Sequence, residues 1–444
     1  MSTKVTGIYD ARKELGWGKS IIMGLQQCFA MFGATILVPV LTNSYGEGIV
    51  GLSASVTLFC AGVATLWFHF ITKGKVPVFL GSSFAFLGMY GAIIPQYGKE
   101  YATGGVVAAG GLYVILAILI KVLGTKRVMK LFPPVVCGPL IILIGINLAG
   151  SAVNNLLTNW ALGIVPILVI IICNTWGKGM IKIIPVLISL IVSYIVAIIM
   201  GAVSFDGVSA AAWVGLPNFH LPKFNADAIV AGLAVAVAAM VEHIGDVMAI
   251  GATTGKNYIA DPGLTRTLLG DGLATAFAGM FGGPANTTYG ENTGVLALSR
   301  VYDPRVIRLA ALYAIILSFS PKFDALVNSI PTAIVGGVSF VLYGMISAVG
   351  VRNVVENRVD LTKSRNLIIA AVIFVCGLGF SSTGGITFTV GSADITLTGL
   401  AIAALAGVIL NALLPGNDYE FGVSVEGDKS ADLGSCLLYT SDAA

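Results

Sequence analysis

Long apolar runs joined by short polar connections make up nearly all of this chain. A helix needs about 20 mainly apolar residues to cross a bilayer, and such stretches follow one another from residue 20 to residue 414. Charged residues are only 11% of the 444 residues, too few to cover the surface of a water-soluble protein of this size. The runs are continuous, which favours helices over the alternating strands of a barrel. We therefore expect an all-α polytopic membrane protein.

Fourteen apolar stretches are candidate membrane spans. Lysine and arginine gather on the cytoplasmic side of membrane proteins. With the N-terminus in the cytoplasm, all 25 lysines and arginines except Lys99, Lys223 and Lys322 fall on that side. Both termini are then cytoplasmic. The candidate spans are residues 20–41, 50–71, 77–97, 102–123, 132–152, 158–176, 181–203, 226–250, 264–282, 286–301, 304–320, 331–350, 365–381 and 396–414.

A pattern in the fifth span returns in the twelfth, each time after a proline. Fourteen spans would then divide into two halves of seven, and an odd number sends the second half across the membrane in the opposite direction. Such inverted repeats are typical of secondary transporters. The matching residues are Val136, Gly138, Leu143, Gly145 and Ala149, and Val335, Gly337, Leu342, Gly344 and Ala348.

The third and tenth spans, equivalent in the two halves, are interrupted. Residues 77–84 and 284–291 each contain a proline, a short extended stretch and small hydroxyl residues. We expect each to form a short strand, paired antiparallel, followed by a half-helix; ordinary kinked helices are the alternative. Irregular backbone is tolerated at membrane depth only where it is buried or lines a cavity. The first N–H groups of a half-helix can bind a polar ligand.

Four acidic residues lie inside predicted spans, where an ionisable group is costly and usually functional. Glu242 and Asp246 are four residues apart, so they share one face of a helix. Two carboxylates so close cannot both ionise cheaply, and one should hold a proton, which suits a proton carrier. Asp271 and Glu291 lie in the next two spans. The alternative for all four is a structural acid that joins helices by hydrogen bonds.

The three histidines give weaker indications. His243 follows Glu242 and points about 100° away from it on the helix, so a structural hydrogen bond and a proton relay stay equally open. His69 and His220 are expected to be solvated. No metal-ligand spacing, nucleophile–base pattern or phosphate-binding loop appears, so the sequence suggests neither an enzyme nor an ATP-driven pump. The absence of a basic tract excludes nucleic acid as a partner.

At these residues the sequence resembles the nucleobase/ascorbate transporter family, and within it the bacterial uracil permeases, up to about Pro415. Residues 29–39, 81–86 and 242–245 carry part of the resemblance. The stretch Asn-Thr-Thr-Tyr-Gly-Glu-Asn-Thr-Gly at residues 286–294 looks like the family signature and is highly specific.

The resemblance implies two inverted repeats of seven spans arranged as a core domain and a gate domain. It also implies proton-coupled import of uracil across the bacterial plasma (inner) membrane by a homodimer that associates through its gate domains, with no cofactor or metal. The implied divisions are a cytoplasmic N-terminus at 1–19, core spans at 20–123 and 226–320, gate spans at 132–203 and 331–414, and a cytoplasmic tail at 415–435.

The resemblance also assigns roles to single residues. Glu242 and Glu291 match the family's substrate-binding carboxylates, and Phe84 matches the aromatic residue that stacks on the base. The ionisable residues inside the spans independently predict proton coupling at Glu242 and Asp246, together with Asp271 and His243. The rest of the pocket wall would be Ala34, Tyr289 and Gly290.

Three departures from the family pattern bear on the substrate. Gln27 stands where the family usually has histidine. Asp246 stands where uracil permeases carry histidine and purine transporters carry aspartate, and purine transporters also have an acid like Asp271. Glu291 points the other way, because those purine transporters usually have glutamine there. Uracil is the expected substrate, a purine such as xanthine or urate is the alternative, and an anion channel or exchanger is a further one.

The last nine residues, 436–444, resemble the translation of a transposase-adapter sequence used in DNA library preparation. We expect this tail to be non-native.

Overall fold

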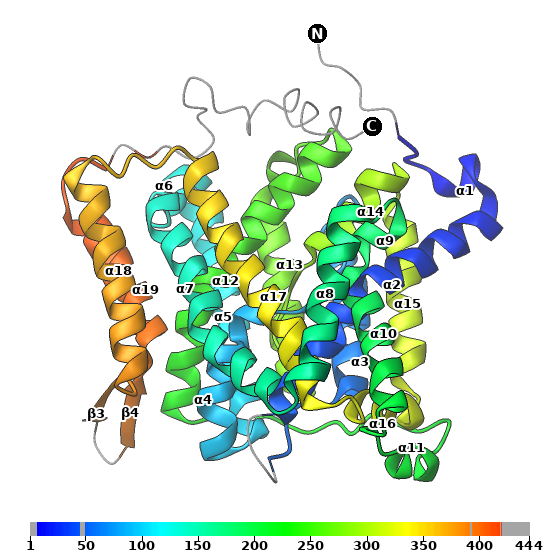
Figure 1. Ribbon diagram of the computed structural model, residues 1–444. Helices are drawn as coiled ribbons and strands as arrows, with labels where there is room; N and C mark the ends of the chain where they lie inside the picture. Colours follow the sequence, from blue (N-terminus) through cyan, green and yellow to red (C-terminus); the bar gives the residue numbers. More distant parts are fainter. Residues whose placement is uncertain (1–6, 45–48, 391–392, 418, 420–444) are drawn as a thin grey trace.

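The computed structural model describes residues 7–44, 49–390, 393–417 and 419, and in this part of the chain the protein is mostly helical (Figure 1). The adapter-like residues 436–444 lie outside the described residues. The elements of the first half are α1 (Ala11–Glu14), α2 (Gly16–Asn43), α3 (Ala54–Ile71), β1 (Leu80–Ser82), η1 (Phe84–Phe86), α4 (Leu87–Tyr97), α5 (Lys99–Leu123), α6 (Thr125–Met129), α7 (Pro134–Leu157), α8 (Trp160–Trp176), α9 (Met180–Ile183), α10 (Pro185–Ile199) and α11 (Asp206–Ala210).

The rest of the chain, from residue 226, again contains long helices, with three short strands among them. Its elements are α12 (Ala226–Thr254), η2 (Ile259–Gly263), α13 (Leu264–Met280), β2 (Asn286–Thr288), α14 (Gly290–Ser299), α15 (Pro304–Ser318), α16 (Pro321–Asn328), α17 (Thr332–Glu356), α18 (Ser364–Ser382), β3 (Ile386–Val390), β4 (Ala393–Leu397) and α19 (Gly399–Leu413).

Each predicted span coincides with one of these helices or with a strand followed by a helix, except 181–203, which holds the two helices α9 and α10. Among the described residues, seven helices are long and apolar enough to cross a membrane, or eight if the bent pair α15 and α16 is one span. The helices α8, α10 and α19 are apolar but shorter. A multi-pass membrane protein is therefore well supported, whereas the number of fourteen crossings stays a prediction.

The two interrupted spans meet in the interior as an antiparallel pair of strands, as predicted. Leu80 is opposite Thr288 and Ser82 is opposite Asn286. The ladder continues beyond the strands, where the Ser83 amide donates to the Ala285 carbonyl at 2.8 Å. Buried backbone must find hydrogen-bond partners, and this pairing supplies them for a chain that is not helical.

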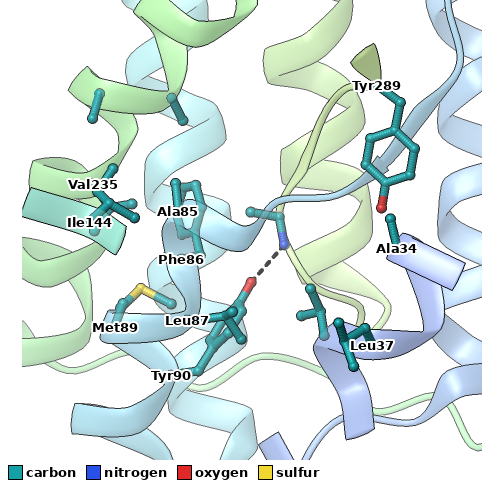
Figure 2. Close-up of a cluster of buried hydrophobic side chains, with 14 of the residues drawn as sticks. Ala34, Leu37, Ala85, Phe86, Leu87, Met89, Tyr90, Ile144, Val235 and Tyr289 are labelled. Carbon is teal, nitrogen blue, oxygen red and sulfur yellow. Dashed lines mark hydrogen bonds between the residues drawn. The ribbon is translucent and has the colours of Figure 1, made fainter. Parts of the chain in front are cut away.

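A close contact explains the glycine at the centre of β1. A Cβ atom on Gly81 would overlap the ring of Tyr289, so no side chain fits between the two. A second tyrosine holds the other strand, because the Ala285 amide donates to the Tyr90 hydroxyl at 2.8 Å (Figure 2). The antiparallel pair of β1 and β2, which we call the strand crossing, is thus held by two aromatic side chains as well as by its own hydrogen bonds.

The long helices pack in pairs that join the two halves. α7 lies along α17, α5 along α13, and α3 along α15. Glycines bring α7 and α17 close, because a Cβ at Gly138 or Gly350 would meet backbone of the partner helix; small residues allow such close packing inside membranes. Helices α18 and α19 pack on each other and on α7, at one side of the bundle (Figure 1).

The prediction that His69 is solvated is wrong. The side chain is buried near the end of α3, and its Nε2 lies 2.9 Å from the carbonyl oxygen of Val78. The chain turns back after α3 and passes this histidine on its way to β1, so the ring gives the buried Val78 carbonyl a hydrogen-bond partner. His220 is half-buried, with its ring against Gly282.

Candidate functional site

Two half-helices begin at the strand crossing. The chain enters η1 at Phe84, directly after β1, and enters α14 at Gly290, directly after β2. Among the described residues, neither start has a side chain that caps it. Apart from the Glu291 amide, which contacts its own carboxylate, the first N–H groups of both helices therefore remain for a ligand, and each helix start carries a partial positive charge.

Helix α12 supplies two carboxylates to this region. It packs against η1, α4, β2 and α14, and thus against both interrupted segments. Glu242 and Asp246 are partly exposed on it, whereas His243 between them is buried. Asp246 is fixed by the crossing, because the Thr288 hydroxyl at the end of β2 donates to its Oδ2 at 2.6 Å.

Glu291 is the second residue of α14 and is partly exposed, like Glu242. The residues beside these acids leave room for a ligand. Gly245 and Gly290 are exposed, and a Cβ on either would meet nothing within 4 Å. Phe84 is half-buried at the start of the other half-helix. Carboxylates, an aromatic ring and free helix starts thus come from three segments that pack together.

Asp271 and His243 form a separate, fully buried pair. Asp271 lies on α13, and its Oδ2 is 3.1 Å from Nδ1 of His243. Both side chains are inaccessible to solvent, so this contact joins α12 to α13 away from the accessible acids. The sequence left two roles open for His243, a structural hydrogen bond and a proton relay. The contact with Asp271 is compatible with both.

Tyr289 and Ala34 are both buried, and they lie beside each other (Figure 2). The Tyr289 hydroxyl donates to the Ser82 carbonyl at 3.1 Å and lies 3.2 Å from the Thr35 hydroxyl. It therefore ties α2 to β1. The Tyr289 hydroxyl therefore holds the strand crossing together. Only the ring of Tyr289 can contribute to the wall of the expected substrate pocket.

The sequence did not identify two polar residues that position the acids. Thr288 donates a hydrogen bond to Asp246. It belongs to the interrupted segment 284–291, from which the sequence predicted a half-helix. Asn292, which follows Glu291, donates from Nδ2 to the backbone oxygen of Gln27 at 2.9 Å and to its side-chain oxygen at 2.8 Å. Gln27 stands where the family usually has histidine. This departure was the one feature of the sequence that could have drawn attention to the Gln27–Asn292 contact.

Residues 18–386 match the model of a family described as "Permease family". Among similar curated proteins, the uracil permease of Bacillus caldolyticus is 41% identical over 90% of this chain and 93% of its own length. The uracil permease of Bacillus subtilis (strain 168) is 40% identical over 92% of this chain and 95% of its own length.

Two solved structures have a similar fold. The transmembrane domain of the cyanobacterial bicarbonate transporter BicA matches with a TM-score of 0.60 and 15% identity, over 92% of this chain and all of that one. SLC26A9 matches with a TM-score of 0.64 and 12% identity, over 91% of this chain and 66% of that one. At such low identity these likenesses concern the fold alone.

Proposed function

The chain belongs to this permease family, and on that premise we propose that it is a secondary active transporter that imports uracil by proton symport. The relatives named uracil permeases, at about 40% identity over nine-tenths of the chain, support the substrate. One structural observation carries the mechanism: two partly exposed carboxylates, Glu242 and Glu291, flank the uncapped start of a half-helix inside a bundle of apolar helices.

Uracil suits such a site because its ring carries both N–H donors and carbonyl acceptors. In the proposal, Glu242 and Glu291 accept the ring N–H groups, and the free N–H groups at the start of α14 donate to a carbonyl. Gly290 leaves the backbone accessible. Phe84 stacks on the flat ring. Tyr289 and Ala34 close the wall behind the strand crossing.

The proton is proposed to travel on the acids of α12. Glu242 and Asp246 share one face, and both are accessible in part, so protonation of one can accompany the arrival of uracil. The buried pair of His243 and Asp271 would respond to that change from the next helix, at 3.1 Å. Release of uracil and proton on the cytoplasmic side would then complete symport.

We further propose fourteen crossings in two inverted repeats of seven. The packing of helices supports this arrangement, because contacts recur when each element is exchanged for its equivalent in the other half. α5 packs on α13 as α3 packs on α15, and α17 packs on α8 as α7 packs on α18. The crossing of β1 and β2 lies on the implied two-fold axis.

The same packing supports the proposed divisions, which the family resemblance implies. The core domain would hold the spans at 20–123 and 226–320, with the substrate site, and the gate domain those at 132–203 and 331–414. The large exposed apolar side chains of α18 and α19, such as Val375 and Leu405, suit lipid or a second subunit, and we propose that the gate domain forms a homodimer.

The orientation is proposed from charge. Short helices α1, α6 and α9 lie toward one end of the bundle and carry Arg12, Lys126 and Lys182. Helix α16, with Lys322, and helix α11 lie toward the other end (Figure 1). By the positive-inside rule the first end is cytoplasmic, with residues 1–19 and 415–435 on that side of a bacterial inner membrane.

A purine substrate is the competing proposal, favoured by Asp246 and Asp271. It is separated from uracil by competition: we expect excess unlabelled uracil to remove most of the uptake of labelled uracil into cells expressing the protein, and an equal excess of xanthine to leave most of it. Stronger inhibition by xanthine than by uracil, or uptake of labelled xanthine without uptake of labelled uracil, would refute the uracil assignment. An anion channel is disfavoured by acids in the site, and it would carry current without a nucleobase.

A further inference from the structure

A cavity of about 540 Å³ lies at the end of the bundle that holds α1, away from the strand crossing. Ligand sites are commonly about 300–1,000 Å³. It is formed where the loops after α3, α12 and α14 meet the start of α15 and the chain before α1. Its lining includes the cationic residues Lys75, Lys256, Arg305 and Arg308.

Two of these four cations are already neutralised. Lys75 pairs with Asp261 at 2.6 Å, and Arg305 pairs with Asp10 at 3.0 Å. The remaining acid of the lining, Asp303, is also occupied. Its two carboxylate oxygens accept the backbone amides of Arg305 and Ala11, both at 2.9 Å, so it caps α15 and fastens α1.

The other two cations have no carboxylate partner in the described part of the chain. Lys256 is exposed, with its Nζ 4.5 Å from the centre of the Tyr9 ring. Arg308 is half-buried, and its Nε is fully buried without a hydrogen-bond partner among the described residues. This buried Nε is out of reach of a ligand, but the half-buried guanidinium group of Arg308 lines the cavity, and its charge has no carboxylate partner among the described residues.

We propose that this cavity binds a phosphate-bearing anion through Arg308 and Lys256. The guanidinium group donates in a fixed fork to phosphate oxygens, and the lysine adds a mobile charge. The rings of Tyr9, Tyr258 and Tyr302 also border the cavity, so a further organic group on the ligand would meet them. A soluble phosphate ester and the headgroup of an anionic phospholipid share this chemistry.

The cavity is physically joined to the segments that carry the site carboxylates. The Tyr9 hydroxyl donates to the backbone oxygen of Thr254 at 2.6 Å, at the end of α12. Ile8 forms a parallel bridge with Val301, just after α14. The proposal itself concerns binding alone and does not depend on the transported substrate.

The test uses full-length protein in nanodiscs, without a transport assay. In discs of neutral lipid, inorganic phosphate is titrated against a chloride blank of equal ionic strength by calorimetry. In a second arm, retention of phosphatidylglycerol is measured by native mass spectrometry. The variants are Arg308→Gln and Lys256→Gln, and the control is Arg127→Gln, an exposed arginine of α6 outside the cavity.

We expect saturable binding of phosphate, of phosphatidylglycerol, or of both, weakened about tenfold (about 1.4 kcal/mol) by each cavity variant and unchanged by the control, since each cavity variant removes one of the two unpaired charges. Binding in the first arm identifies a soluble ligand, and binding in the second arm alone identifies a lipid. If Arg308→Gln does not fold, the exposed Lys256→Gln decides. Absence of binding in both arms, or equal weakening by Arg127→Gln, would overturn the proposal.

Discussion

The hydroxyl of Thr288 donates to Asp246 Oδ2 at 2.6 Å and thereby joins the strand crossing to the helix that carries the site acids. A hydrogen bond to a carboxylate contributes about 1.5–3 kcal/mol. One contact therefore fixes where α12 presents Asp246 relative to the half-helix that begins two residues beyond Thr288. Any movement of the crossing would also move this acid.

Replacing Thr288 tests that link. Thr288→Val keeps the shape of the side chain and removes the donor, and we expect uracil uptake to fall about tenfold. Thr288→Ser retains a hydroxyl and should recover most of the activity. Initial rates of labelled-uracil uptake, normalised to protein in the membrane, measure both. Equal loss in the two variants would show that packing, and not the hydrogen bond, matters.

Gln27 is expected to position the half-helix that carries Glu291. Gln27→Ala removes the side-chain acceptor of Asn292, so we expect a several-fold higher KM for uracil and a loss of about 1–2 kcal/mol in stability. The neighbouring Gln26→Ala is the matched control, since Gln26 is only partly buried. A KM unchanged in Gln27→Ala would show that the backbone oxygen of Gln27 holds Asn292 alone.

Gly81 should tolerate no side chain. Gly81→Ala forces a methyl group into the ring of Tyr289, and overpacking of a buried site typically costs about 1–3 kcal/mol. Gly88→Ala, in the following half-helix, meets open space and should leave the melting temperature unchanged or slightly higher. Thermal unfolding followed by size-exclusion chromatography compares the two. Similar melting temperatures would contradict the close contact at the crossing.

His220 should make stability depend on pH. Burial lowers the pKa of His220, and the nearby positive charge of Lys99 lowers it further. The unfolded chain then binds a proton that the folded protein does not, so stability is full above the ordinary histidine pKa of about 6.5 and is lost as pH falls below it. His220→Gln should flatten the melting temperature between pH 7 and pH 5. An unchanged slope would contradict this.

Local patterns predicted much of this fold. Prolines followed by small hydroxyl residues predicted both strands, with kinked helices as the alternative, and the structure shows the strands. The spacing of Glu242 and Asp246 indicated a shared helix face. The lysines after His69 marked the end of a span, and His69 was therefore expected to be solvated. Charge does not show which carbonyl a side chain will contact, and His69 is buried.

The residues that position the acids could not be predicted, because their partners are distant in the chain. Thr288 is 42 residues from Asp246, and Asn292 is 265 residues from Gln27. Such pairs depend on how two interrupted spans and two long helices pack together, which no periodicity specifies. The cationic cavity is formed by three loops, the start of α15 and the chain before α1. From the sequence, its lysines and arginines indicated only which side of the membrane is cytoplasmic.

Uptake of labelled uracil into sodium-free proteoliposomes tests the central claim most directly. With an inward proton gradient, we predict accumulation above equilibrium that a protonophore abolishes, and no accumulation by Glu242→Gln. Uracil uptake at wild-type rates by Glu242→Gln would contradict the role of that carboxylate. Absence of uracil uptake by a preparation that takes up xanthine would contradict the proposed substrate, and uptake of uracil without any dependence on the gradient would contradict proton symport.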